Sequence, residues 1–378
     1  MPFALLLPIH FLLTLATDGP REWIRALPPA HVEVSPSQHE IVIELAPVDV
    51  PAGMTHHDAM AMGSGMQGMG GGHHQMEEAH FPAYPPVMGV DLPLSGWMSA
   101  FRIELVDAQG HPLPSALLHH YNLIDPNHRE LFLPISRRVL AAGSETGPVK
   151  MSRWLLGARF AQGDRLIASA MLHNPTPQSY TGVRTRLILT YTDDGHWWPL
   201  VKAYPWQFDV AFPVGDKSFD LPPGRSAKSY EGSPAVPGKI VGIGGHVHDH
   251  AVTLDLLDVT SGDTLWTAKP ITDSTGRVVG MPIKKFFRLT GIGVAIVPAH
   301  RYRVTVTYDN PTGAVLPQGG MGVVAGLFKP ASGTTWPVAD FSDSLYVQDL
   351  RHALRLGPTE PIAARATHSG AGVEHTHD

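Results

Sequence analysis

Two histidines spaced two residues apart, His246 and His248, form the motif in this sequence that is best suited to chemistry. They close the segment Gly-Gly-His-Val-His at 244–248. On a β-strand, residues i and i+2 share a face and their backbones lie roughly 6–7 Å apart, so two imidazoles can converge on one metal ion. The preceding glycines permit a bend or the close approach of another segment. The motif is also typical of two solvent-facing histidines. His250 continues the same face and is a substitute ligand.

Three further histidines come before this motif. His119 and His120 are adjacent, and adjacent strand residues point to opposite faces. Both can therefore bind one metal ion only where a β-bulge or a strand end turns one of them; otherwise one is buried and the other exposed. His173 ends an apolar run just before an Asn-Pro turn. That position suits a ligand held at the end of a sheet, and it equally suits a histidine that caps the turn.

A methionine completes the candidate ligands. Met321 lies in the segment Gln-Gly-Gly-Met-Gly at 318–322, where glycines leave room for a close approach to the sulfur. Most methionines fill hydrophobic cores, and that is the alternative here. Three imidazoles suit copper or zinc, whereas two imidazoles with a thioether favour copper, because soft sulfur prefers Cu(I).

The segment 54–76 is of low complexity and has too little periodic apolar content to pack, so it is predicted to be a mobile loop inserted in the first domain. Its dense methionine and histidine side chains predict capture of copper in an oxidising compartment. The alternative is a flexible polar tract of accidental composition. The candidate ligands are Met54, His56, His57, Met60, Met62, Met66, Met69, His73, His74 and Met76.

The composition excludes several classes of protein. The 378 residues include 22 histidines and 13 methionines but no cysteine, so disulfides and thiolate metal sites are excluded. A net charge of −6, with no Lys/Arg-rich run, argues against nucleic-acid binding. No apolar stretch reaches 18 residues, so no membrane-spanning helix is expected. We find no Gly-x-Ser-x-Gly elbow, phosphate-binding glycine loop or His-Glu-x-x-His motif.

The candidate ligands must be positioned by β-strands, because the sequence shows short strand patterns separated by turn residues. The chain is rich in glycine (38) and proline (35), and only 16% of it is charged, a profile of all-β proteins. Its length suits two domains of about 150 residues. We therefore predict two tandem antiparallel β-sandwich domains, over 37–195 and 196–350. Strands are predicted at 101–106, 117–123, 165–172, 183–191, 241–244, 252–257, 286–289, 302–308 and 321–328.

The two ends of the chain are predicted to lie outside these domains. Residues 1–17 contain an apolar run with a small residue at Ala16, which fits a signal peptide, although no positive residue precedes the run. We therefore expect an exported protein, periplasmic or secreted. The polar tail 351–378 contains further histidines and is predicted to be disordered.

The two halves carry a similar late motif. An Asn-Pro-Thr turn occurs at 174–176 and again at 310–312, and each follows a histidine-bearing segment at a comparable distance. This indicates duplicated or similarly built domains.

The order of these motifs, His-His, His, His-x-His and Met, resembles the copper type II, ascorbate-dependent monooxygenases, the family of the peptidylglycine α-hydroxylating and dopamine β-monooxygenases. Order and approximate spacing fit over residues 37–330, apart from the insert. The resemblance implies two jelly-roll domains with a solvent-exposed cleft between them. It assigns an electron-transfer copper to His119, His120 and His173. It assigns the catalytic, oxygen-binding copper to the other triad, which is His246, His248 and Met321.

The sequence also departs from this family. The animal enzymes carry disulfides, which this chain cannot form. Where the peptide hydroxylase binds a substrate carboxylate through arginine, asparagine and tyrosine, this chain has Gly244, Val323 and Ala325. None of these side chains can bind a carboxylate, so peptide amidation is not carried over.

Three functions follow as alternatives. The first is a copper-dependent monooxygenase, with two copper ions per chain, that hydroxylates a C–H bond of an unknown small substrate with O2 and a reductant such as ascorbate. The second is a non-catalytic periplasmic protein that binds, stores or delivers copper on the same scaffold, with copper-handling proteins as partners. The third is a structural β-sandwich protein with incidental histidines.

Overall fold

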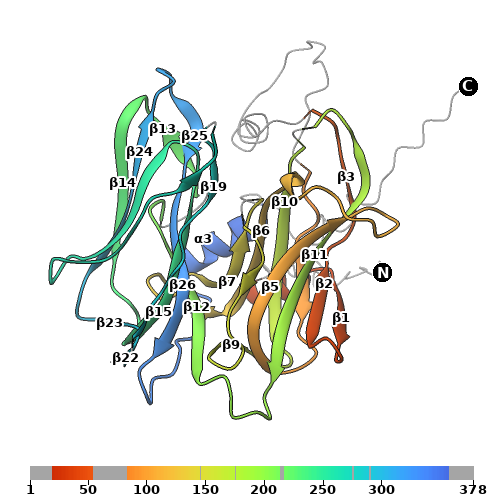
Figure 1. Ribbon diagram of the computed structural model, residues 1–378. Coiled ribbons are helices and arrows are strands. Elements are labelled where there is room, and N and C mark those ends of the chain that lie inside the picture. The colour runs from red at the N-terminus through yellow and green to blue at the C-terminus, as the bar shows by residue number, and fades with distance from the viewer. Residues whose placement is uncertain are drawn as a thin grey trace, which may run out of the picture.

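The computed structural model describes residues 19–53, 83–144, 146–174, 176–212, 217–274, 276–288 and 291–356 (Figure 1). The predicted signal peptide, the insert 54–76 with its ten candidate ligands, and the tail beyond 356 lie outside these ranges. Of the described residues, 54% are in strands and 6% in helices, and the strands form several mainly antiparallel sheets, which confirms the predicted all-β sandwich class. No helix among the described residues is long and apolar enough to cross a membrane.

The N-terminal half is a sandwich of two sheets. Apolar side chains alternate along the strands, as Ile41 and Ile43 do in β2, and their inward faces form one core with Tyr121 and Leu187. The first sheet contains β1 (His31–Ser35), β2 (Glu40–Glu44), β3 (Val48–Val50), β5 (Gly96–Val106), β8 (Val149–Lys150), β9 (Leu156–Phe160) and β11 (Tyr180–Asp193). The second contains β4 (Met88–Asp91), β6 (Leu118–Arg129), β7 (Ser136–Ala142) and β10 (Arg165–Leu172).

The C-terminal half repeats this plan around a second core, which includes Trp206, Phe208 and Val306. One sheet contains β12 (Val201–Asp209), β15 (Gly238–Val247), β20 (Lys284–Lys285), β23 (Val294–Ile296) and β26 (Gly322–Pro330). The other contains β14 (Gly224–Gly232), β16 (Ala251–Asp258), β17 (Asp263–Ala268) and β24 (Tyr302–Asn310). Three short pairs complete the half: β13 (Phe219–Leu221) with β25 (Leu316–Gly320), β18 (Ile271–Thr272) with β19 (Val278–Gly280), and β21 (Phe287–Arg288) with β22 (Gly291–Ile292).

The two halves share one sheet. β12 pairs in parallel with β9, with Val201 opposite Leu156 and Ala203 opposite Ala158, so a twelve-stranded sheet runs through both halves. Figure 1 shows the halves side by side, with β12 and β26 at their junction. A small apolar cluster that includes Leu156, Val201 and Val241 seals this junction. The predicted domain boundary at 195/196 falls in the connection between β11 and β12.

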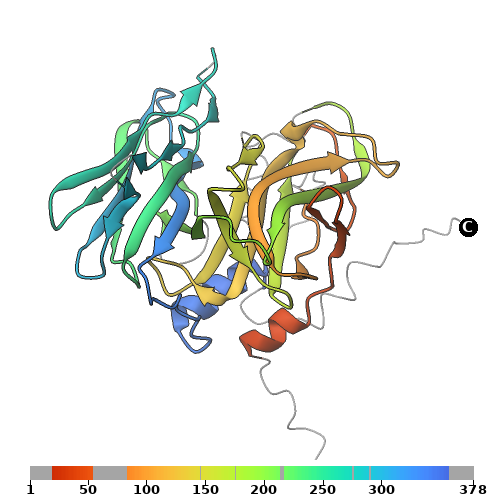
Figure 2. The same ribbon diagram turned by 60° about the horizontal axis from the view of Figure 1, so that its bottom comes forward.

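The C-terminal segment returns to the N-terminal half. Helix α3 (Ser344–Ala353) is capped by Asp343 and buries Tyr346 and Leu350 against α1 (Pro20–Arg25) and β6. Figure 2 shows both helices on the same end of the molecule. The helix crosses the predicted domain limit at 350, so 351–353 are helical. Ten residues give too short a periodic pattern to be recognised in the sequence.

The two Asn-Pro-Thr turns are built alike. The Asn174 side chain accepts hydrogen bonds from the Thr176 backbone N–H (2.9 Å) and hydroxyl (2.7 Å), and donates to the carbonyl of Pro51. Asn310 accepts the same two bonds from Thr312 (3.1 and 2.7 Å) and donates to the carbonyl of Leu221. Asn174 thus joins the end of β10 to the segment that follows β3, and Asn310 joins the end of β24 to β13.

Candidate metal centre

His246 and His248 extend from the end of β15. β15 pairs with β26, with His246 opposite Val323, and Val247 between the histidines is buried in the core. Alternation therefore places both imidazoles on the other face, where their ring centroids lie 5.5 Å apart. His250 does not continue this face, because the strand ends at Val247 and His250 adopts φ 70° in the turn that follows.

Gly245 allows the close strand approach that the sequence indicated. A Cβ atom there would lie 2.4 Å from Leu254 Cδ2 and 2.7 Å from the carbonyl oxygen of Val323. Gly244 is more open, since its Cβ would meet only the Ile283 side chain, at 3.3 Å. Gly245 is thus required for the packing of the strand that carries the two histidines.

A β-bulge brings His119 and His120 to the same side. β6 pairs with β10 with His120 opposite Met171 and Leu118 opposite Leu172, so His119 is the extra residue. The bulge turns one of the adjacent side chains, and the two ring centroids lie only 4.1 Å apart. This is the condition under which the sequence allowed both histidines to serve one site. The His173 ring lies 5.4 Å from that of His119.

The histidines of the two halves meet. The ring of His120 lies 5.5 Å from that of His246, and nitrogen atoms of His120, His246 and His248 all lie within 4.8 Å of one another. Metal–nitrogen bonds of about 2.0–2.1 Å place the nitrogens of one ion roughly 3–4 Å apart. Small side-chain rotations therefore suffice to close this group on one ion. The family resemblance assigns His120 to the first triad, whereas its position allows it to serve either half.

Tyr308, on β24, fixes the chain around His248 and Met321. Its buried hydroxyl accepts hydrogen bonds from the backbone N–H groups of His248 (3.1 Å) and Met321 (2.8 Å), and donates to the Met321 carbonyl. Burial raises the pKa of Tyr308 to about 12, so the hydroxyl keeps its proton at neutral pH. The last pair of β15 and β26 joins Val247 to Gly322, so His248 and Met321 each lie one residue beyond the paired strands.

The glycines around Met321 have a different cause from the one expected. A Cβ on Gly320 would lie 2.3 Å from the ring of Phe219, and one on Gly322 would lie 2.7 Å from Val306 Cβ. These two positions must be glycine because the side chains of Phe219 and Val306 already occupy the space that a Cβ atom would need.

Asp209 was not recognised in the sequence. Asp209 on β12 is opposite Val323 on β26, and Val323 is in turn opposite His246 on β15. The three residues therefore form one row across neighbouring strands of the sheet. The carboxyl is fully buried, and burial raises its pKa to about 6 against the opposing charges of Lys217 and Arg138. A carboxylate in this position would offset positive charge on the histidine face. The detectable signal was a charged residue within the apolar stretch 206–212.

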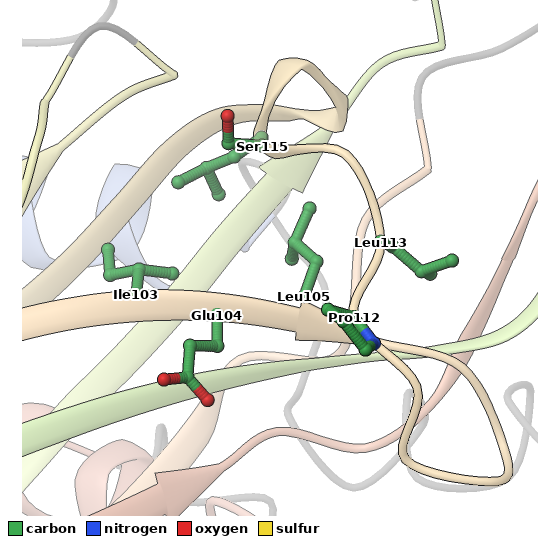
Figure 3. A pocket seen from close by; sticks show the side chains of 7 residues that line it. Ile103, Glu104, Leu105, Pro112, Leu113 and Ser115 are labelled. Atoms are coloured by element: carbon green, nitrogen blue, oxygen red, sulfur yellow. The ribbon is translucent and has the colours of Figure 1, made fainter.

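Two hollows of the described surface lie away from the histidines. One, of about 150 Å³, lies beside β5 and is lined by residues that include Leu105, Leu113 and Ser115 (Figure 3). The other, of about 220 Å³, lies over β1, β2 and β11 and is lined by charged side chains such as Glu44 and Arg186. The histidine cluster is recognised by its donor atoms.

The donor set can be tested against copper. All donors of the grouped site are imidazole nitrogens, the backbone of Met321 is joined to that of His248 through the Tyr308 hydroxyl, and the chain has no cysteine. Imidazole with thioether suits copper, whereas the hard cations Ca²⁺ and Mg²⁺ prefer oxygen ligands. His119, His173 and His248 are buried, while His120 and His246 are half-buried, which leaves one side of the cluster accessible. The residues present fit copper.

Comparison with known proteins gives no family. No family model matches the chain, and no curated protein matches it. Among solved structures, it is similar to the major capsid protein P2 of bacteriophage PM2, with 8% identity and a TM-score of 0.31 over 78% of this chain and 99% of that chain. It is also similar to a fucolectin from striped bass (Morone saxatilis) serum, with 9% identity and a TM-score of 0.17 over 78% and 97% of the two chains. At these scores the likenesses carry no argument about function.

Proposed function

We propose that this protein is a copper-dependent monooxygenase that hydroxylates a C–H bond of a small substrate with O2 and an external reductant such as ascorbate. The observation that supports it is the grouping of His120, His246 and His248, from both halves, with nitrogen atoms within 4.8 Å of one another. Copper bound there would supply one-electron chemistry and a position for dioxygen. Three imidazoles suit copper or zinc, and the order of the motifs, with Met321 as the last of them, favours copper.

The surrounding residues would hold this site and control access to it. Val247 and Gly245 anchor the histidine strand in the core, and Tyr308 fixes the backbone of His248. The half-buried His120 and His246 leave the approach for a substrate on their exposed side. The buried Asp209 carboxylate would offset the positive charge of the loaded cluster.

Copper storage or delivery is the second candidate, and the composition of 54–76 favours it. This segment concentrates methionine and histidine without cysteine, the donor types that capture copper without thiolate. In that case the same cluster would bind copper without turnover, and the partners would be other copper-handling proteins.

The test compares copper loading with turnover in the purified full chain. Copper per chain is measured after dialysis, and ascorbate-dependent O2 uptake is followed with a panel of C–H substrates. We expect His246→Ala and His120→Ala to lose copper and product, while His111→Ala, at an exposed histidine paired with Asp107, keeps both. Copper bound without any hydroxylated product supports storage or delivery. Unchanged copper content in both cluster variants would reject the proposal.

A further inference from the structure

We propose that one end of the protein docks on the surface of an anionic lipid bilayer through a tryptophan patch, which consists of Trp154, Trp197, Trp198 and Leu200. The patch is formed by the connection between β11 and β12 together with the segment that precedes β9. Docking there does not depend on copper binding.

The tryptophan patch is a contiguous apolar surface. Trp197 is 73% exposed, Leu200 is 61% exposed and Trp154 is 48% exposed. Trp198 joins them, because its ring centroid lies 5.3 Å from that of Trp197 and 4.3 Å from that of Trp154. Single exposed apolar residues are common on soluble proteins, whereas several large ones in contact mark a surface for interaction.

Two segments that are distant in the sequence hold the patch in place. The Leu200 backbone N–H donates to the Trp154 carbonyl (3.0 Å), just before the parallel pairing of β9 with β12 begins. Pro199 is buried against Gly157, where a Cβ atom would lie 2.8 Å from Pro199 Cγ. Figure 1 shows the connection between β11 and β12 projecting at the lower end of the molecule. The exposed rings are therefore carried by a projecting segment that is fixed to the sheet.

The orientation of the rings favours a lipid surface over a polysaccharide. A sugar ring stacks on an open aromatic face, and an extended polysaccharide needs several such faces in one plane. Here the ring of Trp197 is turned by 86° from that of Trp198, and the ring of Trp154 by 47°. His196 stacks on Trp198 at 4.2 Å and 10°, so it covers one face of that ring. Indole rings of any orientation can enter a membrane interface, where the ring meets apolar chains and its N–H stays hydrated.

The charges around the patch complement anionic lipid. The segments 149–160 and 193–202 carry four basic and two acidic residues, a net charge of +2, whereas the whole chain carries −6. These residues are Lys150, Arg153, Arg159 and Lys202, with Asp193 and Asp194. Asp194 is paired with Arg159 (2.9 Å), while Arg153 and Lys202 form no ion pair with any described residue and lie over tryptophan rings. A basic side chain beside an anionic membrane strengthens binding.

The patch is separate from the candidate metal centre. β12 begins at Val201, next to the patch, and Asp209 at its other end shares a row of the sheet with His246. Eight residues of extended strand span about 26 Å. Substitutions in the patch therefore leave the histidines in place.

The experiment measures sedimentation of the full chain with vesicles of phosphatidylcholine that contain phosphatidylserine as one third of the lipid. The parent chain should sediment with them, and brominated acyl chains should quench part of its tryptophan fluorescence. Trp197→Ala combined with Leu200→Ala should weaken binding by more than about tenfold, because two apolar side chains no longer enter the interface. Arg153→Gln and Lys202→Gln should each weaken it by about fivefold, and raised salt should weaken binding of the parent chain.

The matched control removes two apolar side chains of similar exposure elsewhere. Ile283, beside Gly244 of β15, is 64% exposed, and Val338, which bridges to His128, is 72% exposed. Ile283→Ala combined with Val338→Ala should bind vesicles as the parent chain does. Circular dichroism checks that each variant is folded.

Three results would overturn the docking. The first is a parent chain that stays in solution, including one that forms dimers or binds a polysaccharide gel through the patch instead. The second is vesicle binding that survives in the Trp197→Ala, Leu200→Ala variant. The third is equal binding to vesicles of phosphatidylcholine alone, which would remove the part assigned to anionic lipid.

Discussion

The hydroxyl of Tyr308 accepts a hydrogen bond from the backbone N–H of His248 at 3.1 Å. The same hydroxyl accepts a hydrogen bond from the backbone N–H of Met321 and donates one to the Met321 carbonyl. One buried side chain therefore connects the strand end that carries the last histidine of the cluster with the turn that carries the methionine. The backbone position of Met321 relative to His248 depends on this connection, because Met321 itself lies between β25 and β26.

Tyr308→Phe tests that connection. The phenyl ring still fills the core, but two backbone N–H groups lose their acceptor, which should cost about 1–3 kcal/mol of unfolding free energy. X-ray absorption of the Cu(I) protein should show a weaker sulfur contribution. Tyr302→Phe is the control, because Tyr302 is on the same strand and its hydroxyl accepts from Val297 at 3.1 Å, away from the histidines. If the copper spectrum changed equally in Tyr308→Phe and Tyr302→Phe, the role of Tyr308 would be purely structural.

Gly245→Ala should destabilise the protein, and Gly244→Ala should not. The new methyl group at 245 would meet Leu254 and the Val323 carbonyl well inside van der Waals contact, an overpacking that costs about 1–3 kcal/mol. At 244 it would meet only the exposed side chain of Ile283, which can move aside. Chemical unfolding of both variants measures the difference. Equal free energies of unfolding would contradict the strand approach described for β15 and β26.

Asp349→Ala should be among the most destabilising substitutions outside the cores. It leaves the Arg138 guanidinium buried without its carboxylate partner, and breaking a buried pair in this way costs about 3–5 kcal/mol. Replacing both residues together, as Arg138→Met with Asp349→Leu, should recover part of that loss, because Arg138 no longer lacks a partner, while Lys217 still loses its contact with Asp349 (3.8 Å). A double-mutant cycle in urea measures the coupling. A loss below about 1 kcal/mol in Asp349→Ala would show that Arg138 finds another partner.

The sequence was sufficient for some of the strands and for the three histidines of the cluster, but not for their grouping. His246 and His248 are separated by one residue, so strand alternation alone places them together. The contact of His120 with His246 depends on how the halves join, and the pairing of β9 with β12 leaves no periodic mark in either strand. The sequence named a bulge only as the condition for His119 and His120 to bind one ion. It could not locate the bulge, because one extra residue becomes apparent only when the register of two paired strands is known.

Residues that act through burial were the hardest to recognise. Asp209 and Tyr308 are ordinary members of apolar strands in the sequence, and their importance comes from strands that are distant along the chain. Helix α3 was missed because its ten residues are stabilised by contact with α1 and β6, and not by a strong helical pattern of their own. The family resemblance stays a prediction, since no comparison tests it.

Glu130 gives a pH dependence with a defined sign. Its carboxylate is fully buried between the halves and accepts backbone N–H bonds from Leu131 (2.9 Å), Gln207 (3.0 Å) and Arg138 (3.0 Å). Burial nevertheless raises its pKa from 4.5 to about 7. The folded protein therefore holds this proton more tightly than the unfolded chain does. Between about pH 4.5 and 7 the folded state binds more protons, so this group lowers stability as the pH rises through that window.

Glu130→Gln should remove that dependence. A shift of this size corresponds to about 3 kcal/mol between pH 4.5 and pH 7.5. The amide oxygen can still accept from Leu131 and Gln207, but the amide nitrogen faces the Arg138 N–H, so the variant should be less stable at low pH. Between pH 4.5 and pH 7.5, the free energy of unfolding of the parent chain should therefore fall by about 3 kcal/mol more than that of the variant. Parallel pH profiles for the two proteins would show that Glu130 is already ionised in the folded state at low pH.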